Sequence, residues 1–410
     1  MNVPACRLCG AKLMASFLDL GSMPLANRYL TAEAIARGEE RAYPLHARVC
    51  DSCRLVQVDS AVPPEEIFSD YAYFSSYSTS WVEHARRFAT AAIQRFGLGK
   101  ESLGVEVASN DGYLLRHFKA AGIPVLGIEP AANVAAAARA QGIPTETVFF
   151  AADTAMEIAA THGSADLIVA NNVLAHVPDI FGFVAGFAAA LHPHGAAVFE
   201  FPHLLELVER VQFDTIYHEH FSYLSLLVVE RVLRANGLRA FDVERLTTHG
   251  GSLRLYVCHA NAPFAPRPSV RAARAAETRA GLDRPEGYAG FAGKVAQARD
   301  RFRAFLHERR REGRVVAAYG AAAKGNTFLN SCGATPNDIV WVADRNPAKQ
   351  GRLLPGSHIP VVPPETAERE PPDDLIVLPW NIAPEIVAQL APLQKCGTQF
   401  WVATPDIHRL

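Results

Sequence analysis

Residues 104–112 read Gly104-Val-Glu-Val-Ala-Ser-Asn-Asp-Gly112, an apolar run that ends in small and polar residues. Such a run predicts a buried strand followed by a tight loop. Three more strand candidates follow at 125–128, 166–170 and 195–200, with helical patterns between them. Because strands alternate with helices, we expect an α/β fold with a parallel, doubly wound sheet.

The loop after the first strand is where a fold of this class binds a nucleotide-like ligand. Glu129 ends the second strand, a position from which a carboxylate accepts hydrogen bonds from ribose hydroxyls. NAD and S-adenosylmethionine both contain adenosine, so this acid does not separate them. A dinucleotide needs phosphate-binding glycines, which the loop lacks. The polar loop suits the charged methionine end, so S-adenosylmethionine is favoured, with candidate ligands Glu106, Ala108, Asn110, Asp111, Gly112, Glu129 and Pro130.

Two cysteine pairs, Cys6-x-x-Cys9 and Cys50-x-x-Cys53, dominate the start of the chain. They predict a four-thiolate zinc site, because each pair supplies two ligands from one turn. Four thiolates complete a tetrahedron and leave no open position, so the zinc is expected to be structural. A redox dithiol is the alternative for either pair alone. The remaining cysteines stand in apolar surroundings and are expected in the core: Cys258, Cys332 and Cys396.

The stretch Ile216-Tyr-His-Glu-His-Phe-Ser-Tyr223 groups two histidines, a glutamate and two tyrosines. Imidazole, carboxylate and phenol groups move protons near neutral pH. The stretch follows the cofactor-binding unit, where folds of this class place their substrates. It is therefore a candidate catalytic segment. The alternative is a polar turn in which His218 and His220 only satisfy backbone groups.

Two further segments are candidates for substrate contacts. Residues 70–78 are rich in aromatic and hydroxyl groups, and their phenols, with Tyr73 among them, suit a sugar-sized pocket. Packing of the zinc module against the next domain is the equal alternative for this segment. Residues 315–344 begin another α/β unit, and Lys324 near the start of its helix suits a diphosphate. A purely structural role is the alternative there.

Composition excludes several classes of protein. The chain has 410 residues, 49% of them hydrophobic and 20% charged, with a formal net charge of -2. These values indicate a globular protein of two or three domains and give no sign of nucleic-acid binding. No apolar run reaches the roughly 18 residues of a membrane span, and no secretory signal is visible, so we expect a cytoplasmic protein without a membrane partner. The oligomeric state does not follow from the sequence.

Several long motifs resemble one known family. They are 105–115 (Val-Glu-Val-Ala-Ser-Asn-Asp-Gly-Tyr-Leu-Leu), 127–130 (Gly-Ile-Glu-Pro), 171–176 (Asn-Asn-Val-Leu-Ala-His), 215–224 (Thr-Ile-Tyr-His-Glu-His-Phe-Ser-Tyr-Leu) and 319–326 (Tyr-Gly-Ala-Ala-Ala-Lys-Gly-Asn). Together with the cysteine pairs they are similar to the zinc-containing, S-adenosylmethionine-dependent sugar C-methyltransferases of deoxysugar biosynthesis. The resemblance covers essentially the whole chain in the same order.

The resemblance implies domains, a reaction and roles. It implies a zinc-binding module at 1–75, a Rossmann-like methyltransferase domain at 76–265 and a second Rossmann-like α/β domain at 266–410 that binds the nucleotide sugar. Family members methylate a carbon beside the ketone of a nucleotide-linked, here expected dTDP-linked, 4-keto-deoxysugar. His220 matches the base that removes the proton, with Glu219 beside it. The other matching positions are Tyr217, His176 and Tyr71 facing the sugar, Asn172 at the cofactor, and Asn326 with Lys324 at the substrate.

Two other kinds of enzyme and one non-enzyme compete with this interpretation. The first is an NAD-dependent oxidoreductase of a nucleotide sugar, with Tyr217 or His220 as proton donor. The second is an O-methyltransferase on the same scaffold. The third is a non-catalytic zinc-containing scaffold, which the dense polar cluster at 217–220 disfavours. The sequence does not reveal which sugar or which carbon is methylated.

Overall fold

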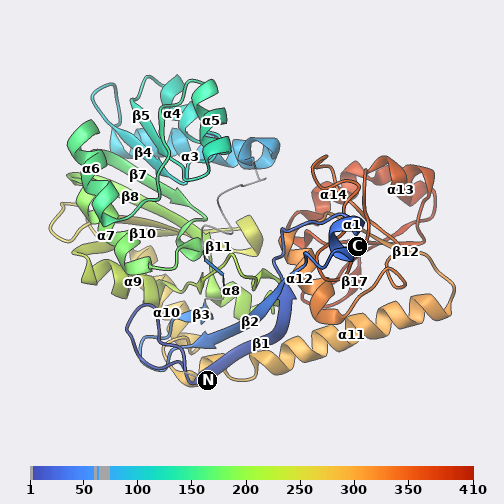
Figure 1. Cartoon of the computed structure of the whole chain (residues 1–410). Coiled ribbons are helices and arrows are strands. Elements are labelled where there is room, and N and C mark those ends of the chain that lie inside the picture. The colour runs from blue at the N-terminus through green and yellow to red at the C-terminus, as the bar shows by residue number, and fades with distance from the viewer. Residues whose placement is uncertain (1–2, 60–61, 64–73) are drawn as a thin grey trace.

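The computed structural model describes residues 3–59, 62–63 and 74–410, which form three sheets (Figure 1). The first is antiparallel, with strand order β1-β2-β3-β9. Its last strand comes from the middle of the chain, so the N-terminal module is completed by the candidate catalytic segment. The elements are β1 (Ala15–Pro24), α1 (Ala32–Ala36), β2 (Ala42–Val49), β3 (Val56–Val58) and β9 (Ser222–Tyr223).

The second sheet has seven strands in the order β10-β11-β8-β7-β4-β5-β6. The strands from β8 to β6 are parallel, as predicted, and the hairpin of β10 and β11 extends the sheet antiparallel. The strands are β4 (Gly104–Val107), β5 (Val125–Ile128), β6 (Thr145–Glu146), β7 (Ala165–Asn171), β8 (Leu191–Pro202), β10 (Leu238–Leu246) and β11 (Ser252–His259).

Helices cover both faces of this sheet because successive residues of a buried strand point to opposite sides. In β7, Ile168 and Ala170 pack in one core with α6, α7 and α9, whereas Leu167 and Val169 pack in another with α3 and α4. The helices of this region are α3 (Thr79–Phe96), α4 (Leu115–Ala120), α5 (Ala132–Ala140), α6 (Ala152–His162), α7 (Ile180–Ala190), α8 (Leu204–Glu209), α9 (Leu226–Ala235) and α10 (Pro268–Arg279).

The third sheet has the order β14-β13-β12-β15-β16-β17 and is parallel except for β17. It confirms the second α/β unit expected from residue 315 onward, in which the strand β13 (Val342–Ala343) is only two residues long. The other elements are β12 (Val316–Tyr319), α12 (Ala323–Cys332), β14 (Val361–Val362), α13 (Glu365–Arg369), β15 (Asp374–Val377), α14 (Ala383–Gln389), α15 (Ala391–Lys395), β16 (Gln399–Val402) and β17 (His408–Arg409).

The long helix α11 (Phe291–Arg311) runs along one side of the molecule from the first sheet to the C-terminal unit (Figure 1). Phe291 at its start stacks on Phe17 of β1 at 4.5 Å between ring centroids, and Phe302 contacts Phe328 of α12. Among the described helices none is both long and apolar enough to cross a bilayer. The domain boundaries and the cytoplasmic location stay predictions.

One expectation about the core is wrong. Cys258 and Cys332 are buried, but Cys396 is exposed. It follows α15 at a surface turn, and the apolar residues around it in the sequence point the other way, as buried Leu393 does.

Candidate active site

The two cysteine pairs form one metal site. The four Sγ atoms of Cys6, Cys9, Cys50 and Cys53 all lie within 4.8 Å of one another. The Sγ atoms of Cys6 and Cys53 lie 3.5 Å apart, as do those of Cys9 and Cys50. These distances are close to the roughly 3.8 Å between sulfurs in a tetrahedral zinc–thiolate site. The thiols therefore fit a structural zinc ion, and no fifth His, Cys, Asp or Glu joins them among the described residues.

The two turns that carry these thiols have the same backbone geometry. The amide of Gly10 donates to the carbonyl of Cys6, and the amide of Arg54 donates to that of Cys50, both at 2.9 Å. Gly10 and Arg54 both have a positive φ, at 73° and 66°. Only the first turn has the glycine that this conformation favours, so the second accepts some strain to hold its thiols.

The loop after β4 is unusually tight. Ala108, Asn110 and Gly112 all have a positive φ, although only one of them is glycine. A Cβ on Gly112 would lie 2.8 Å from the Cγ1 atom of Ile143, so the position requires glycine. Strained backbone of this kind gathers at ligand sites, because surrounding contacts must hold it in place.

Glu129 at the end of β5 holds this loop. Its Oε2 accepts a hydrogen bond from the amide of Asn110, and its Oε1 accepts one from the amide of Ala131, both at 2.9 Å. Burial raises the pKa of Glu129, and the two amides oppose that rise. Each carboxylate oxygen has two lone pairs, so the group still has acceptor sites for a ribose. Pro130 lies between Glu129 and Ala131 in the chain.

The polar side chains of the loop have partners that the sequence did not reveal. Asn110 Oδ1 accepts a hydrogen bond from the amide of Ser75 at 2.8 Å, and Asp111 Oδ2 accepts from the backbone and hydroxyl of Ser76. They therefore dock the 3₁₀ turn η1 (Ser75–Tyr77) onto the loop. Glu106 lies in β4, just before the loop, where burial and the charges of Glu129 and Asp111 raise its pKa.

Several buried oxygens at this edge of the sheet accept no hydrogen bond from the described residues. Among them are Asp111 Oδ1, Asn171 Oδ1 and Asn172 Oδ1. Asn172, which has a φ of 57°, directs its Nδ2 to His249 Nε2 at 3.1 Å. Unsatisfied buried acceptors are costly, so they mark a place where a ligand with donor groups fits. The ammonium and hydroxyls of S-adenosylmethionine are such donors.

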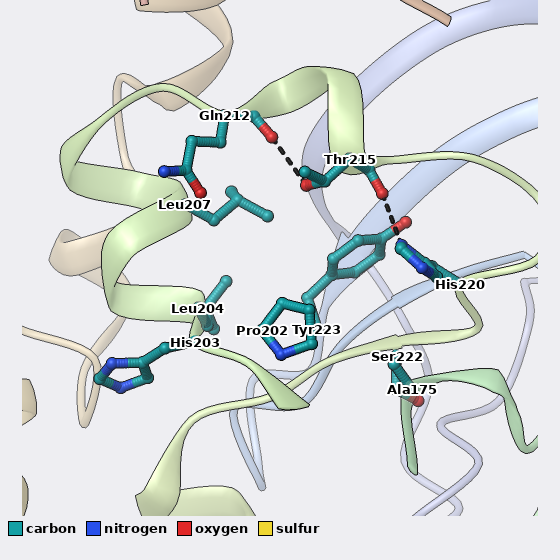
Figure 2. Close-up of a pocket in the computed structure, with 10 residues that line it drawn as sticks. All are labelled: Ala175, Pro202, His203, Leu204, Leu207, Gln212, Thr215, His220, Ser222 and Tyr223. Atoms are coloured by element: carbon teal, nitrogen blue, oxygen red, sulfur yellow. Dashed lines mark hydrogen bonds between the residues drawn. The ribbon is translucent and has the colours of Figure 1, made fainter. Parts of the chain in front are cut away.

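His220 is held in one tautomer. Its Nδ1 lies 2.8 Å from the carbonyl oxygen of Thr215, which can only accept, so Nδ1 carries the proton (Figure 2). Nε2 therefore has the lone pair, and the Tyr217 hydroxyl donates to it at 2.9 Å. Burial lowers the pKa of His220 well below its ordinary value, and the charges of His176 and Lys324 add to this effect. The ring is a neutral base at physiological pH.

His176 lies against this base, whereas Glu219 and His218 have other partners. The rings of His176 and His220 lie 4.7 Å apart at 73°, and burial lowers the pKa of His176 to about 4. Glu219 instead accepts a hydrogen bond from Asn27 Nδ2 at 2.6 Å, and burial raises its pKa to about 7. His218 points the other way, with Nε2 3.2 Å from the carbonyl of Tyr43. Three consecutive residues of the segment, His218, Glu219 and His220, therefore contact different parts of the molecule.

A cavity of about 20 Å³ borders the ring of His220 (Figure 2). Thr215, Ser222 and Tyr223 contribute to its wall. A space of this size holds about one water molecule and is too small for a sugar. The cavity lies beside His220 but is not a substrate pocket.

Lys324 of the C-terminal unit places a positive charge near His220. Lys324 lies in the first turn of α12, with Nζ 5.0 Å from the centroid of the Trp380 ring and 3.5 Å from Asn381 Oδ1. Asp214, two residues before the candidate catalytic segment, accepts a hydrogen bond from Trp380 Nε1 at 2.6 Å. Burial raises the pKa of Asp214 to about 6, and the charge of Lys324 opposes that rise. Asn326 is used differently, since its Nδ2 donates to the carbonyl of Ala26.

Sequence reasoning missed several residues that approach the predicted ones. Asn27, Asp214 and Lys349 stand in stretches without any motif, and the charge of Lys349 lowers the pKa of Glu219, in opposition to burial. A lone Asn or Asp gives no local signal, so only the tertiary contacts reveal them. Two predicted residues, Tyr71 and Tyr73, lie outside the described residues.

Comparison with known proteins agrees with this geometry. Three family models match in succession: a zinc binding domain at residues 6–68, a methyltransferase domain at 81–243 and a C-methyltransferase C-terminal domain at 247–405. The C-methyltransferase NovU of Streptomyces niveus is 36% identical over 404 residues, which is 98% of this chain and 96% of NovU.

More distant similarities cover only part of the chain. A ubiquinone biosynthesis O-methyltransferase of Rhodopseudomonas palustris (strain BisA53) is 27% identical over 34% of this chain and 62% of its own length. Magnesium protoporphyrin IX methyltransferase from Synechocystis PCC 6803 with bound S-adenosylmethionine is 13% identical over 49% of this chain and 99% of its own, with a TM-score of 0.36. The full-length match and the three consecutive family models decide the assignment: the chain belongs to the zinc-containing, S-adenosylmethionine-dependent C-methyltransferase family.

Proposed function

We propose that the protein methylates the carbon beside the ketone of a nucleotide-linked 4-keto-deoxysugar. The observation that carries the proposal is the buried, neutral imidazole of His220, whose tautomer is set by the carbonyl of Thr215. A carbon beside a ketone becomes a nucleophile only after it loses a proton, so C-methylation needs a base at this point. An O-methyltransferase acts on a hydroxyl and does not need a base that removes a proton from carbon.

His220 acts as that base through Nε2. The C–H electron pair moves toward the ketone, an enolate forms, and the proton goes to Nε2, leaving an imidazolium ion. Because Nε2 has a single lone pair, the Tyr217 hydroxyl that donates to it in this structure must first turn away, and it would then donate to the enolate oxygen. His176, whose ring lies against His220, is the second candidate donor.

The residues around the loop after β4 would hold the cofactor. S-adenosylmethionine, when bound, supplies a methyl group attached to a positively charged sulfur. Glu129 would accept hydrogen bonds from the ribose, because its position is fixed by the amides of Asn110 and Ala131. Asn172 and Asp111 have buried acceptor oxygens available for the methionine end. Ala108 and Gly112 keep the backbone free of bulk there.

The nucleotide part of the substrate would bind toward the C-terminal unit. Lys324 supplies a cation in the first turn of α12, where the helix dipole also favours an anion. A diphosphate linked to a nucleoside fits this charge. The sugar class itself rests on the resemblance of the motifs at 215–224 and 319–326, since the full-length relative NovU is named only as a C-methyltransferase.

Hydrogen exchange into the substrate tests the proposal directly. With the demethylated cofactor bound, the wild-type protein should exchange the hydrogen beside the ketone of a nucleotide-4-keto-sugar with deuterated water. The His220→Asn variant should lose at least about 100-fold of this rate, the usual contribution of a general base, while cofactor affinity measured by calorimetry stays unchanged. Exchange at the wild-type rate in the variant would remove His220 as the base. No exchange by the wild type with any 4-keto-sugar would favour O-methylation.

A further inference from the structure

The candidate catalytic segment ends in a strand of the zinc module, β9. β9 pairs antiparallel with β3, with Tyr223 opposite Val56 and Ser222 opposite Gln57. The amide of Val58 also donates to the carbonyl of Phe221 at 3.2 Å. Because β3 begins three residues after Cys53, the zinc site lies at one end of the strand that holds β9. His220 immediately precedes Phe221, so the base projects from backbone that this pairing positions.

Arg7 strengthens this junction from inside the first metal-binding turn. It stands between Cys6 and Cys9, and its Nη1 donates to the carbonyl of Val58 at 2.7 Å. Its Nη2 donates to the carbonyl of Phe221, and the guanidinium lies 5.7 Å from the centroid of the Phe221 ring. One planar guanidinium therefore bridges β3 and the catalytic segment, a geometry that lysine cannot reproduce.

Gln57 connects this arginine to the thiols. Its Oε1 accepts a hydrogen bond from the backbone amide of Arg7 at 3.0 Å, and its Nε2 donates to Cys6 Sγ at 3.1 Å. The residue is fully buried. Partners of this kind orient metal ligands, and here the same partner also orients the arginine. A continuous set of contacts thus runs from Cys6 through Gln57 and Arg7 to the residue next to His220.

We propose that Arg7 is a positioning residue for proton removal, and that Gln57 couples its position to the zinc site. The zinc module would then fix the backbone from which Tyr217 and His220 project, in addition to stabilising its own fold. The inference rests on the proposed role of His220. It assigns to Arg7 a function in catalysis without contact with the substrate.

Another arginine provides a matched control. Arg231 of α9 also reaches a metal-binding turn, with Nη1 3.3 Å from the carbonyl of Ser52. It is exposed, and among the described residues it has no hydrogen bond or ion pair to residues 216–223. Replacing it with methionine removes a contact between the methyltransferase domain and the zinc module while leaving the bridge at Phe221 in place.

The experiment compares Arg7→Lys, Arg7→Met and Arg231→Met as full-length zinc-loaded proteins. Four quantities are measured: zinc per chain, affinity for S-adenosylmethionine, backbone amide exchange in peptides covering 216–223, and exchange of the substrate's hydrogen. We expect both Arg7 variants to retain zinc and cofactor binding. Their amides at 217–223 should exchange at least about tenfold faster, because a local opening becomes easier. Substrate exchange should fall about 100-fold, the scale of a small misplacement of a reacting group.

The outcomes separate this inference from the proposed function. Amide exchange needs no sugar, so it tests Arg7 even if the wild type fails to exchange any substrate hydrogen. Amide protection and turnover in Arg7→Lys equal to those of Arg231→Met would overturn the role of Arg7. Loss of zinc or of cofactor binding in Arg7→Lys would also overturn it, because Arg7 would then be a residue of general folding.

Discussion

Two buried imidazoles, His220 and His176, owe their chemistry to their surroundings. Burial lowers the pKa of both, to about 4 for His176. An ordinary imidazole, with a pKa of about 6.5, would lose about three quarters of its neutral form by pH 6. We therefore expect the rate of substrate hydrogen exchange to stay nearly constant from pH 8 to pH 6 as far as His220 is concerned.

A fall in that rate near pH 7 would have a different origin. Glu219 has a pKa raised to about 7 by burial, so it takes up a proton in this range. Measuring the same profile in Glu219→Gln separates the two groups. If the fall persists in that variant with a midpoint near 6.5, the imidazole of His220 has an ordinary pKa and the environment described here does not control it.

His249 should make stability depend on pH. Burial lowers its pKa to about 4 in the folded protein, whereas an unfolded chain binds a proton near pH 6.5. The unfolded state is therefore favoured as pH falls from 6.5 toward 4, by up to about 3 kcal/mol. In His249→Asn the melting temperature should fall less steeply over this range than in wild type. Asparagine tolerates the φ of 53° at this position, so parallel curves for the two proteins would contradict the lowered pKa.

Glu129 can be tested through cofactor affinity. Glu129→Gln replaces one acceptor oxygen with an NH₂ group that faces the amide of Asn110 or Ala131. The loop should shift and the ribose should lose a charged acceptor, which weakens S-adenosylmethionine binding by about 1.5–3 kcal/mol. Calorimetry measures this directly. Unchanged affinity would mean that the cofactor does not contact the end of β5.

At the level of elements, the turn η4 (Thr248–Gly250) meets η6 (Trp380–Ile382) of the C-terminal unit. A Cβ on Gly250 would lie 2.2 Å from Trp380 Cη2. We expect Gly250→Ala to displace the indole from Asp214, so that Lys324 loses its arrangement and KM for the nucleotide sugar rises. Gly237→Ala is the control, because Gly237 also has a positive φ, of 69°, but has no atom within 4 Å of the added Cβ. Equal KM values for the two variants would exclude a role for the contact with Trp380.

The predicted elements were most accurate where hydrophobic patterns are long. The strand expected at 125–128 is β5, and the strand expected at 166–170 is β7 with one additional residue at each end. In the C-terminal unit, β13 is only two residues long because only Val342 and Ala343 pair with both neighbouring strands. Pairing of this kind depends on the partner strands, which a local pattern does not contain.

For the whole molecule, the zinc ion should be the element that organises the N-terminal sheet. Elemental analysis should find about one zinc per chain, and a strong chelator should release it with unfolding of the module around β1 and β2. Because β9 belongs to this sheet, substrate hydrogen exchange should be lost with the zinc, while S-adenosylmethionine still binds at the separate second sheet. An active, folded, metal-free protein would refute this organisation.

The sequence by itself determined the α/β class, the four thiol ligands and the stretch around His220, because each depends on spacing within a few residues. Only the tertiary structure decided how these parts meet. Arg7 reaches Phe221, Asn27 reaches Glu219, and Asp214 shares Trp380 with Lys324 across positions far apart in the chain. The pairing of β3 with β9 and the burial at the junction of the three sheets create these contacts and shift the pKa values. Both are properties of the packed molecule that no local pattern contains.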